Sequence, residues 1–122
     1  MTIKKVKKVW GSEEWIVNNE KYCGKILNLN KGYRSSLHFH KKKHETFYIL
    51  DGKIILELEN ISKLMKAGEV HNISPGEKHR FTPLENSKLI EFSTHHEDSD
   101  TYRETESGKI DLDKLRGGLE IK

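Results

Sequence analysis

The chain has 122 residues, 34% of them hydrophobic and 34% charged, which is typical of one compact domain with a strongly hydrated surface. Its 22 basic and 19 acidic side chains give a formal charge of +3 without a basic face interleaved with aromatic residues, so no nucleic-acid partner is expected. No apolar run is long enough to cross a bilayer, and no apolar stretch of a signal peptide follows the N-terminal lysines. The single cysteine, Cys23, cannot form an internal disulfide, and these features together predict a cytoplasmic protein with no membrane partner.

From the N-terminus onward the chain reads as short strands separated by turns. The predicted strands cover residues 13–18, 22–29, 37–40, 45–50, 53–59, 69–73, 79–82 and 88–94. Asp51-Gly52 between two of these runs is a strong hairpin signal, and Ser74-Pro75-Gly76 marks another tight turn. Many short strands at close spacing, with no helical periodicity before residue 100, predict an all-β sandwich or barrel.

After His95 the sequence becomes polar, which predicts a loop or an ordered flap. Residues 111–116 fit one short helix that Asp111 would cap and Gly117-Gly118 would end. We therefore divide the chain into a barrel with N-terminal strands at residues 1–103 and a polar tail at residues 104–122. That tail is either helical in part or mobile.

Three histidines and one glutamate lie at positions that suit a metal site. Side chains alternate across a strand, so His38 and His40 project from the same face. Glu45 begins the next strand of the hairpin, and His79 begins a later strand that a closed barrel would bring beside them. Histidines two apart on a strand are more often ordinary surface or core residues, but Glu45 and His79 favour the metal interpretation.

This donor set suits one divalent transition metal, namely Zn, Fe, Mn, Ni or Co. Four protein ligands on an octahedral ion leave two positions for water or substrate. Such an open site is typical of catalysis, whereas a structural zinc site is closed by its four ligands.

The spacing of these residues resembles the first motif of the cupin superfamily, which Gly32, His38, His40, Glu45 and Gly52 match without a gap. The second cupin motif is matched by Gly68, Pro75-Gly76 and His79, with Pro83 in place of its final Asn. This resemblance implies a double-stranded β-helix, also called a jelly-roll barrel, with the metal held by the four residues named above.

Within the cupins, the chain looks most like the single-domain type II mannose-6-phosphate isomerases. The matching segments are Val9-Trp10-Gly11, HFHKKKHETFYILDG, PGEKHRF and EDSDTYRE. The resemblance implies a metal-dependent isomerase or epimerase of a sugar or sugar phosphate that works through a metal-stabilised enediolate. The alternatives are an iron-dependent dioxygenase, which uses a similar open site, and a non-catalytic sugar-binding cupin.

The proposed isomerase needs a group that moves a proton between two carbons and groups that hold the substrate. The candidate bases are Glu45, Glu91 and His71. The candidate phosphate-binding residues are Lys25, Arg34 and Arg103, for each of which an ordinary surface charge is the alternative. Arg80 directly follows a metal ligand and is expected to point away from the site.

Several neighbouring residues receive simpler predictions. Residues 41–43 are interpreted as a polar turn with solvated lysines, and His44 is expected to face away from Glu45. His95 and His96 are interpreted as a pocket rim or a solvated loop, with a second metal site as the alternative.

Alternation also bears on assembly. If the motif histidines face inward, their strand neighbours face outward, and the outward apolar residues are Leu37, Phe39, Tyr48 and Leu50. Apolar side chains on both faces of the strands predict that the outer face is covered, either by the N-terminal strands or by a second subunit. We predict a homodimer packed on this face.

Overall fold

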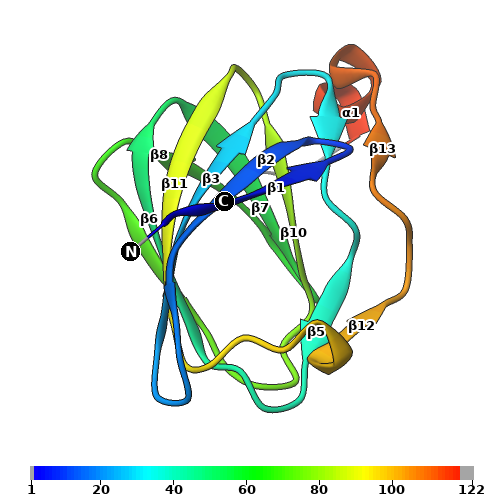
Figure 1. Ribbon diagram of the computed structural model, residues 1–122. Helices are drawn as coiled ribbons and strands as arrows, with labels where there is room; N and C mark the ends of the chain where they lie inside the picture. Colours follow the sequence, from blue (N-terminus) through cyan, green and yellow to red (C-terminus); the bar gives the residue numbers. More distant parts are fainter. Residues whose placement is uncertain (1, 119–122) are drawn as a thin grey trace.

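The computed structural model describes residues 2–118, in which two antiparallel sheets face each other across the interior (Figure 1). The six-stranded sheet has the order β1 (Lys4–Lys8), β2 (Gly11–Asn18), β3 (Cys23–Leu29), β11 (Ser87–Ser93), β6 (Glu45–Asp51) and β9 (Val70–Ile73). The five-stranded sheet has the order β12 (Thr101–Arg103), β5 (His38–His40), β10 (His79–Pro83), β7 (Lys53–Leu58) and β8 (Ser62–Lys66). The predicted all-β jelly roll is confirmed.

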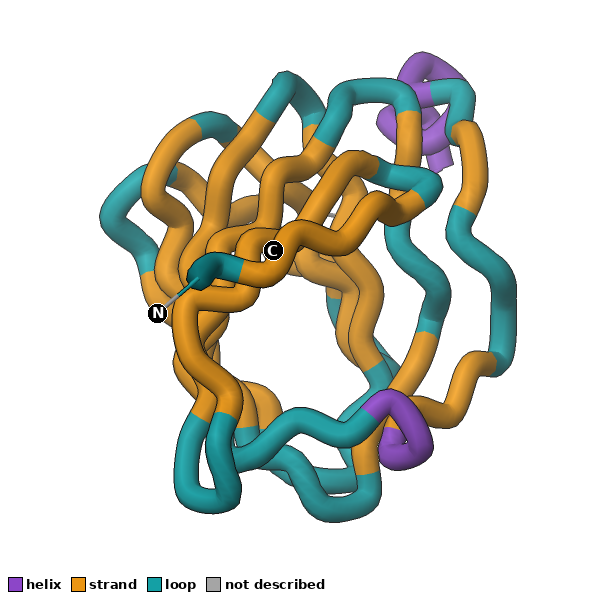
Figure 2. The backbone as a smooth tube through the Cα atoms, in the orientation of Figure 1, coloured by secondary structure: helices purple, strands orange, loops and turns teal. Residues whose placement is uncertain are grey.

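Smaller elements complete the structure. The strands β4 (Tyr33–Arg34) and β13 (Gly108–Lys109) form a separate two-stranded ribbon, and a 3₁₀ helix, η1 (Asp98–Asp100), precedes β12. Figure 2 shows η1 as the lower purple segment, after the loop that leaves β11. No helix in the described part of the chain is long and apolar enough to cross a membrane.

The inward-facing side chains change from apolar to polar along the same strands. On β3 they run from the buried Leu29 and Leu27 to the equally buried Lys25. On β6 they run from Ile49 through Phe47 to Glu45, and β10 and β11 repeat the pattern. Because the strands alternate strictly, each polar residue shares the inner face with the core. The polar ends meet at one end of the barrel, and the functional residues gather there.

The hairpin between β6 and β7 turns at Gly52, as Asp51-Gly52 predicts. Gly52 has a φ of 95°, a backbone conformation that glycine adopts without strain. A Cβ atom at this position would also collide with the side chain of Ser87. This first-motif glycine is therefore required by the turn and needs no part in the chemistry.

The C-terminal segment packs against the barrel over most of its described length. β13 pairs with β4, and the N–H of Ser36 donates to Ser107 Oγ at 3.0 Å. The predicted helix is present as α1 (Leu112–Gly118), and Asp111 Oδ1 accepts the N–H of Asp113 at 3.0 Å, which confirms the predicted cap. The end of the predicted tail, residues 119–122, lies outside the described residues.

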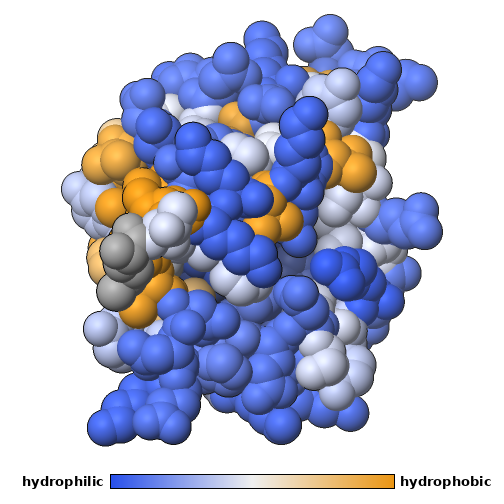
Figure 3. Space-filling view, in the orientation of Figure 1, coloured by the Kyte–Doolittle hydropathy of each residue, from blue (hydrophilic) through white to orange (hydrophobic). Residues whose placement is uncertain are grey.

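The outer face of the six-stranded sheet carries exposed apolar side chains, including Leu50, Val70 and Phe92. The N-terminal strands β1 and β2 extend this sheet at its edge, so they do not cover the face. Figure 3 shows apolar surface gathered on the left of the view, where Figure 1 has β6 and β11, within a mostly hydrophilic surface.

Candidate metal centre

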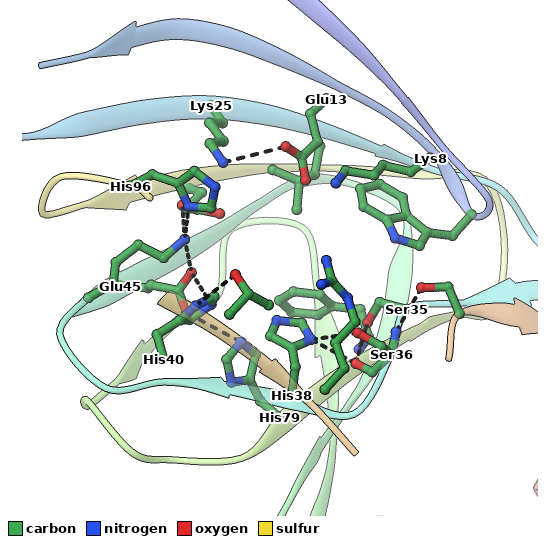
Figure 4. A pocket seen from close by; sticks show the side chains of 18 of the residues that line it. Lys8, Glu13, Lys25, Ser35, Ser36, His38, His40, Glu45, His79 and His96 are labelled. Atoms are coloured by element: carbon green, nitrogen blue, oxygen red, sulfur yellow. Dashed lines mark hydrogen bonds and ion pairs between the residues drawn. The ribbon is translucent and has the colours of Figure 1, made fainter. Parts of the chain in front are cut away.

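Three imidazoles from two adjacent strands converge at the polar end of the barrel (Figure 4). β5 supplies His38 and His40, and β10 supplies His79, which pairs directly with His38 across the sheet. One donor nitrogen from each ring lies within 4.8 Å of the other two. Alternation on β5 and the antiparallel register of β10 are therefore sufficient to assemble the cluster.

Each of these rings has its outer nitrogen, Nδ1, fixed by a backbone carbonyl. The Nδ1 of His38 donates to the oxygen of Ser36 at 2.8 Å, and the Nδ1 of His79 donates to that of Glu77 at 3.0 Å. The Nδ1 of His40 donates to the oxygen of Asp100 at 3.1 Å. Because a carbonyl can only accept, the proton must lie on Nδ1, and each Nε2 keeps its lone pair for a ligand.

Burial keeps two of the rings neutral. It lowers the pKa of His38 to about 3 and that of His40 to about 4, with further lowering from neighbouring cationic groups. Burial also disfavours a charged His79, but the Glu45 carboxylate raises the pKa of that ring. Neutral imidazoles are the form that binds a metal.

Glu45 brings a carboxylate to the same point. Its Oε2 lies 3.3 Å from Nε2 of His79, and its Oε1 lies 3.5 Å from Nε2 of His40. Burial by itself would raise the pKa of Glu45, but His79 and Lys43 hold it well below its usual range, so the carboxylate is anionic.

Three of these inward-facing atoms lack a hydrogen-bond partner in the described part of the chain: Nε2 of His40, Nε2 of His79 and Oε2 of Glu45. Unpartnered buried polar atoms are rare in folded proteins. Imidazole nitrogens around an anionic oxygen are the donor set of a divalent transition metal, so the residues fit the ion that the sequence predicts.

Lys43 is the residue in this region that sequence reasoning placed wrongly. It is 3% exposed. Its Nζ forms an ion pair with Glu45 Oε1 at 2.9 Å and donates to Glu91 Oε2 at 3.1 Å and His96 Nδ1 at 2.8 Å. The physical reason is Asp100, whose carboxylate accepts the backbone N–H groups of residues 41–43 and tightens the turn. Lys43 stands two residues before Glu45, and this spacing was the available signal that the two share a face.

A pocket opens between the imidazoles and a wall of mixed charge. Figure 4 shows Lys25, Glu13 and Lys8 facing the histidines across this space. Lys25 is 2% exposed; its Nζ lies 3.4 Å from Glu13 Oε1 and 4.1 Å from the centre of the Trp15 ring. Of the residues predicted to bind or transform a substrate, Lys25, Arg103, Glu45 and Glu91 line this pocket.

His71, predicted as a base, is not among the residues that line the pocket, so the structure does not bring it together with the imidazoles there. It lies opposite Phe47 on β9, the edge strand of the six-stranded sheet, where Lys63 and Glu77 are its charged neighbours. Alternation on a strand fixes which face a side chain occupies but not where in the sheet the strand lies.

Arg34, predicted as a phosphate ligand, also lies outside the pocket lining. It belongs to the separate ribbon of β4 and β13, near Arg80 and Glu57. Arg80 forms an ion pair with Glu57 at 2.6 Å and is absent from the pocket lining, in agreement with its predicted orientation away from the site.

The remaining histidines divide between surface and rim. His44 is exposed, as predicted, and the Nδ1 of His95 donates to the oxygen of Asn19 at 2.7 Å. His96 lines the pocket, and its Nε2 donates to Asp98 at 2.8 Å. Within residues 2–118, the candidate cluster of metal ligands is that of His38, His40 and His79, and none forms around His95 and His96.

The fold and the site together define a jelly-roll barrel with a metal-binding pocket at one end. The family model described as "Cupin domain" matches residues 25–91, which is more than half of the chain. The chain belongs to the cupin family.

The chain is similar to proteins whose names indicate different functions. Over 56 residues the chain is 38% identical to a quercetin 2,3-dioxygenase of Bacillus subtilis, a match that covers 46% of this chain but only 17% of that protein. A capsular polysaccharide assembling protein, CapF of Staphylococcus aureus, superposes with a TM-score of 0.74 at 17% identity, over 90% of this chain and 32% of that one. KdgF of a Halomonas species superposes with a TM-score of 0.71 at 16% identity, over 81% of this chain and 90% of that one. At these identities the structural matches show the shared fold alone.

Proposed function

We propose that the chain is a metal-dependent isomerase or epimerase of a small sugar or sugar phosphate. The observation that carries this proposal is a second buried carboxylate, Glu91, which lines the same pocket as the three imidazoles and is joined to Glu45 through Lys43. This carboxylate lies beyond the four proposed metal ligands, and it supplies the acid–base group that an isomerase needs.

The donor set would hold the ion on His38, His40 and His79, with Glu45 as the fourth ligand. A divalent ion bound there would act as a Lewis acid toward a carbonyl or hydroxyl oxygen of the substrate. Zn, Fe, Mn, Ni and Co all remain compatible with imidazole and carboxylate donors.

Glu91 is the candidate proton carrier. It is 4% exposed, and burial, assisted by the charge of Glu45, raises its pKa from the usual value of a carboxyl group. A raised pKa suits general acid–base catalysis, because the carboxylate is then a stronger base than a free carboxylate and retains the proton more readily before it returns it. In the proposed isomerisation, Glu91 removes a proton from the carbon next to the substrate carbonyl and returns it to the carbonyl carbon, while the hydroxyl proton moves to the former carbonyl oxygen.

Other residues that line the pocket would bind the rest of the substrate. Lys25 and Arg103 both line the pocket, and they present the point charge and the planar fork that suit phosphate oxygens. Glu13 and Asp98 line the same space and would accept hydrogen bonds from hydroxyl groups. The mixture of acceptors and cations fits a polyhydroxylated anion better than an apolar ligand.

The test is proton exchange in deuterated water. Protein loaded in turn with each candidate metal is incubated with mannose 6-phosphate, glucose 6-phosphate and free pentoses, and deuterium at C2 is followed by NMR. We expect exchange with at least one of these sugars and a loss of at least about 100-fold in the Glu91→Gln variant at unchanged metal content. Glu85→Gln, in the exposed turn before β11, is the matched control and should leave the rate unchanged. Absence of exchange with every metal and sugar would refute the isomerase proposal.

A second candidate is an iron-dependent dioxygenase, because the relative with 38% identity over 56 residues is a quercetin 2,3-dioxygenase. Iron-loaded protein that consumes oxygen with an oxidisable substrate, and loses activity under anaerobic conditions, would favour this second function. Sugar binding with neither exchange of the C2 proton nor uptake of oxygen would favour the third hypothesis, a non-catalytic sugar-binding protein.

A further inference from the structure

Lys43 places a buried positive charge beside a site whose donors fit a cation. Its ammonium group has three N–H donors, and the three acceptors Glu45 Oε1, Glu91 Oε2 and His96 Nδ1 lie at 2.9, 3.1 and 2.8 Å. The ammonium group therefore donates to Glu91 and His96 and forms an ion pair with Glu45, so that protein partners hold it on three sides.

This contact distinguishes the two oxygens of Glu45, both of which lie near an imidazole nitrogen. Lys43 holds Oε1, whereas Oε2 has no hydrogen-bond partner among the described residues and lies 3.3 Å from Nε2 of His79. A carboxylate free of this lysine could offer both of its oxygens to an ion, but the carboxylate seen here has one of them occupied.

The lysine is held in place by groups on both of its sides. Asp100 fixes the backbone of the turn, since its carboxylate accepts the N–H of Lys43 at 3.1 Å. Glu91, which is itself buried, holds the ammonium end and also accepts the hydroxyl of Ser93 at 3.2 Å. Two carboxylates thus keep a cation at a point where it repels any metal ion that approaches the histidines.

We infer that Lys43 is a positioning residue that restricts Glu45 to a single oxygen toward the metal and lowers the affinity of the site for divalent cations. A ligand limited to one oxygen leaves an additional coordination position for the substrate. This inference rests on the proposed metal site and is independent of which reaction the site performs.

The test replaces the lysine by an uncharged side chain of similar length, Lys43→Met. Affinity for Zn²⁺ and Co²⁺ is measured by competition with a chromophoric chelator, and the visible absorption of bound Co²⁺ reports its coordination. We expect the variant to bind both ions at least tenfold more tightly and to change the Co²⁺ spectrum, because the second oxygen of Glu45 becomes available. Equal or weaker affinity, or an unchanged spectrum, would overturn the inference.

Two further comparisons identify the route of the effect. In a Glu45→Gln background, the gain in metal affinity from Lys43→Met should be at least threefold smaller. An equal gain in affinity in both backgrounds would show that the lysine does not act through Glu45. Lys42→Met is the matched control, because the neighbouring Lys42 side chain is 78% exposed and should leave both readouts unchanged.

Removing a buried charge also leaves Glu91 without its partner, which can destabilise the fold. The double variant Lys43→Met with Glu91→Gln removes that carboxylate's charge as well, and the same gain in affinity is expected of it. All of these measurements use the metal alone. A protein that binds metal as described but exchanges no sugar proton would refute the proposed reaction and leave this inference standing.

Discussion

Asp100 is the residue whose replacement should destabilise the fold most clearly through a single side chain. It is 5% exposed, and its carboxylate accepts the backbone N–H groups of Lys41 at 2.9 Å, Lys42 at 3.1 Å and Lys43 at 3.1 Å. A hydrogen bond to a charged acceptor contributes about 1.5–3 kcal/mol. Lys41 and Lys42 are exposed, so water can replace the carboxylate there, whereas the amide of the buried Lys43 would lose its partner. We therefore expect Asp100→Ala to lower the free energy of unfolding by about 3 kcal/mol.

The assay is urea unfolding of the metal-free protein, followed by circular dichroism with excess chelator present. Asp98→Ala is the matched control from the same 3₁₀ helix, since the Asp98 side chain is 84% exposed and binds His96 alone among residues 2–118. That control should change the free energy of unfolding by less than about 1 kcal/mol. If Asp100→Ala lowered the free energy of unfolding by no more than its control does, the reasoning that this carboxylate organises the turn would be refuted.

Three other predictions concern metal binding, stability at low pH and oligomeric state. Replacing His79 by Gln should lower metal content after dialysis to a small fraction of the wild-type value, as measured by elemental analysis, and retention of the metal would contradict the ligand assignment. The pKa values of His40, about 4, and His38, about 3, lie below the ordinary 6.5, so the unfolded chain takes up protons first. Their contribution to the stability of the metal-free protein is therefore complete above pH 6.5 and is lost progressively as the pH falls toward 4 and then 3; urea midpoints that stay constant from pH 7 to 4 would contradict this. Phe92→Lys, at a position 55% exposed on the outer face of the six-stranded sheet, should convert the proposed homodimer into monomer in sedimentation velocity. Wild-type protein that sediments only as monomer at tens of micromolar would refute the dimer.

The histidine cluster could be predicted from the sequence because it depends on local strand geometry and on a single long-range strand pairing, that of β10 with β5. Alternation places His38 and His40 on one face, and the short turn before Glu45 returns the chain to that face. The only long-range step is the position of His79 beside His38, which the spacing of the second motif supplied. The hairpin at Gly52 could be predicted for the same reason, because its signal lies in two adjacent residues, Asp51 and Gly52.

The surroundings of Glu45 could not be predicted in the same way, because they depend on a distant residue. The inward path of Lys43 is fixed by Asp100, which lies 57 residues further along the chain. The family match of the segment EDSDTYRE gives no indication that this carboxylate binds the backbone of residues 41–43. A run of three lysines reads as a solvated turn until that carboxylate is placed beside it. The composition of the segment therefore predicts the exposed Lys42 correctly, but it wrongly predicts that Lys43, which is buried, is exposed.

The two predicted site residues outside the pocket lining show a related limit. His71 pairs with the buried Phe47, but its strand β9 lies at the edge of the six-stranded sheet. Arg34 lies on a ribbon outside both large sheets, and no pattern in the sequence announces that ribbon. Depth along a barrel and membership of a sheet are set by pairing between strands, whereas periodicity reports only the face of a single strand.

The unpartnered atoms of the site argue that metal binding and stability are linked in this protein. Nε2 of His40, Nε2 of His79 and Oε2 of Glu45 are buried without hydrogen-bond partners in residues 2–118, and each such atom costs about 1–3 kcal/mol. One inward step deeper, the same strands carry Phe47 and Phe81, whose rings pack edge to face with centroids 4.6 Å apart. Stability alone would therefore favour continuing the apolar layer to the end of the barrel. An ion that bonds all three atoms would remove this unfavourable term from the folded state only, and so it would raise the melting temperature as its concentration rises.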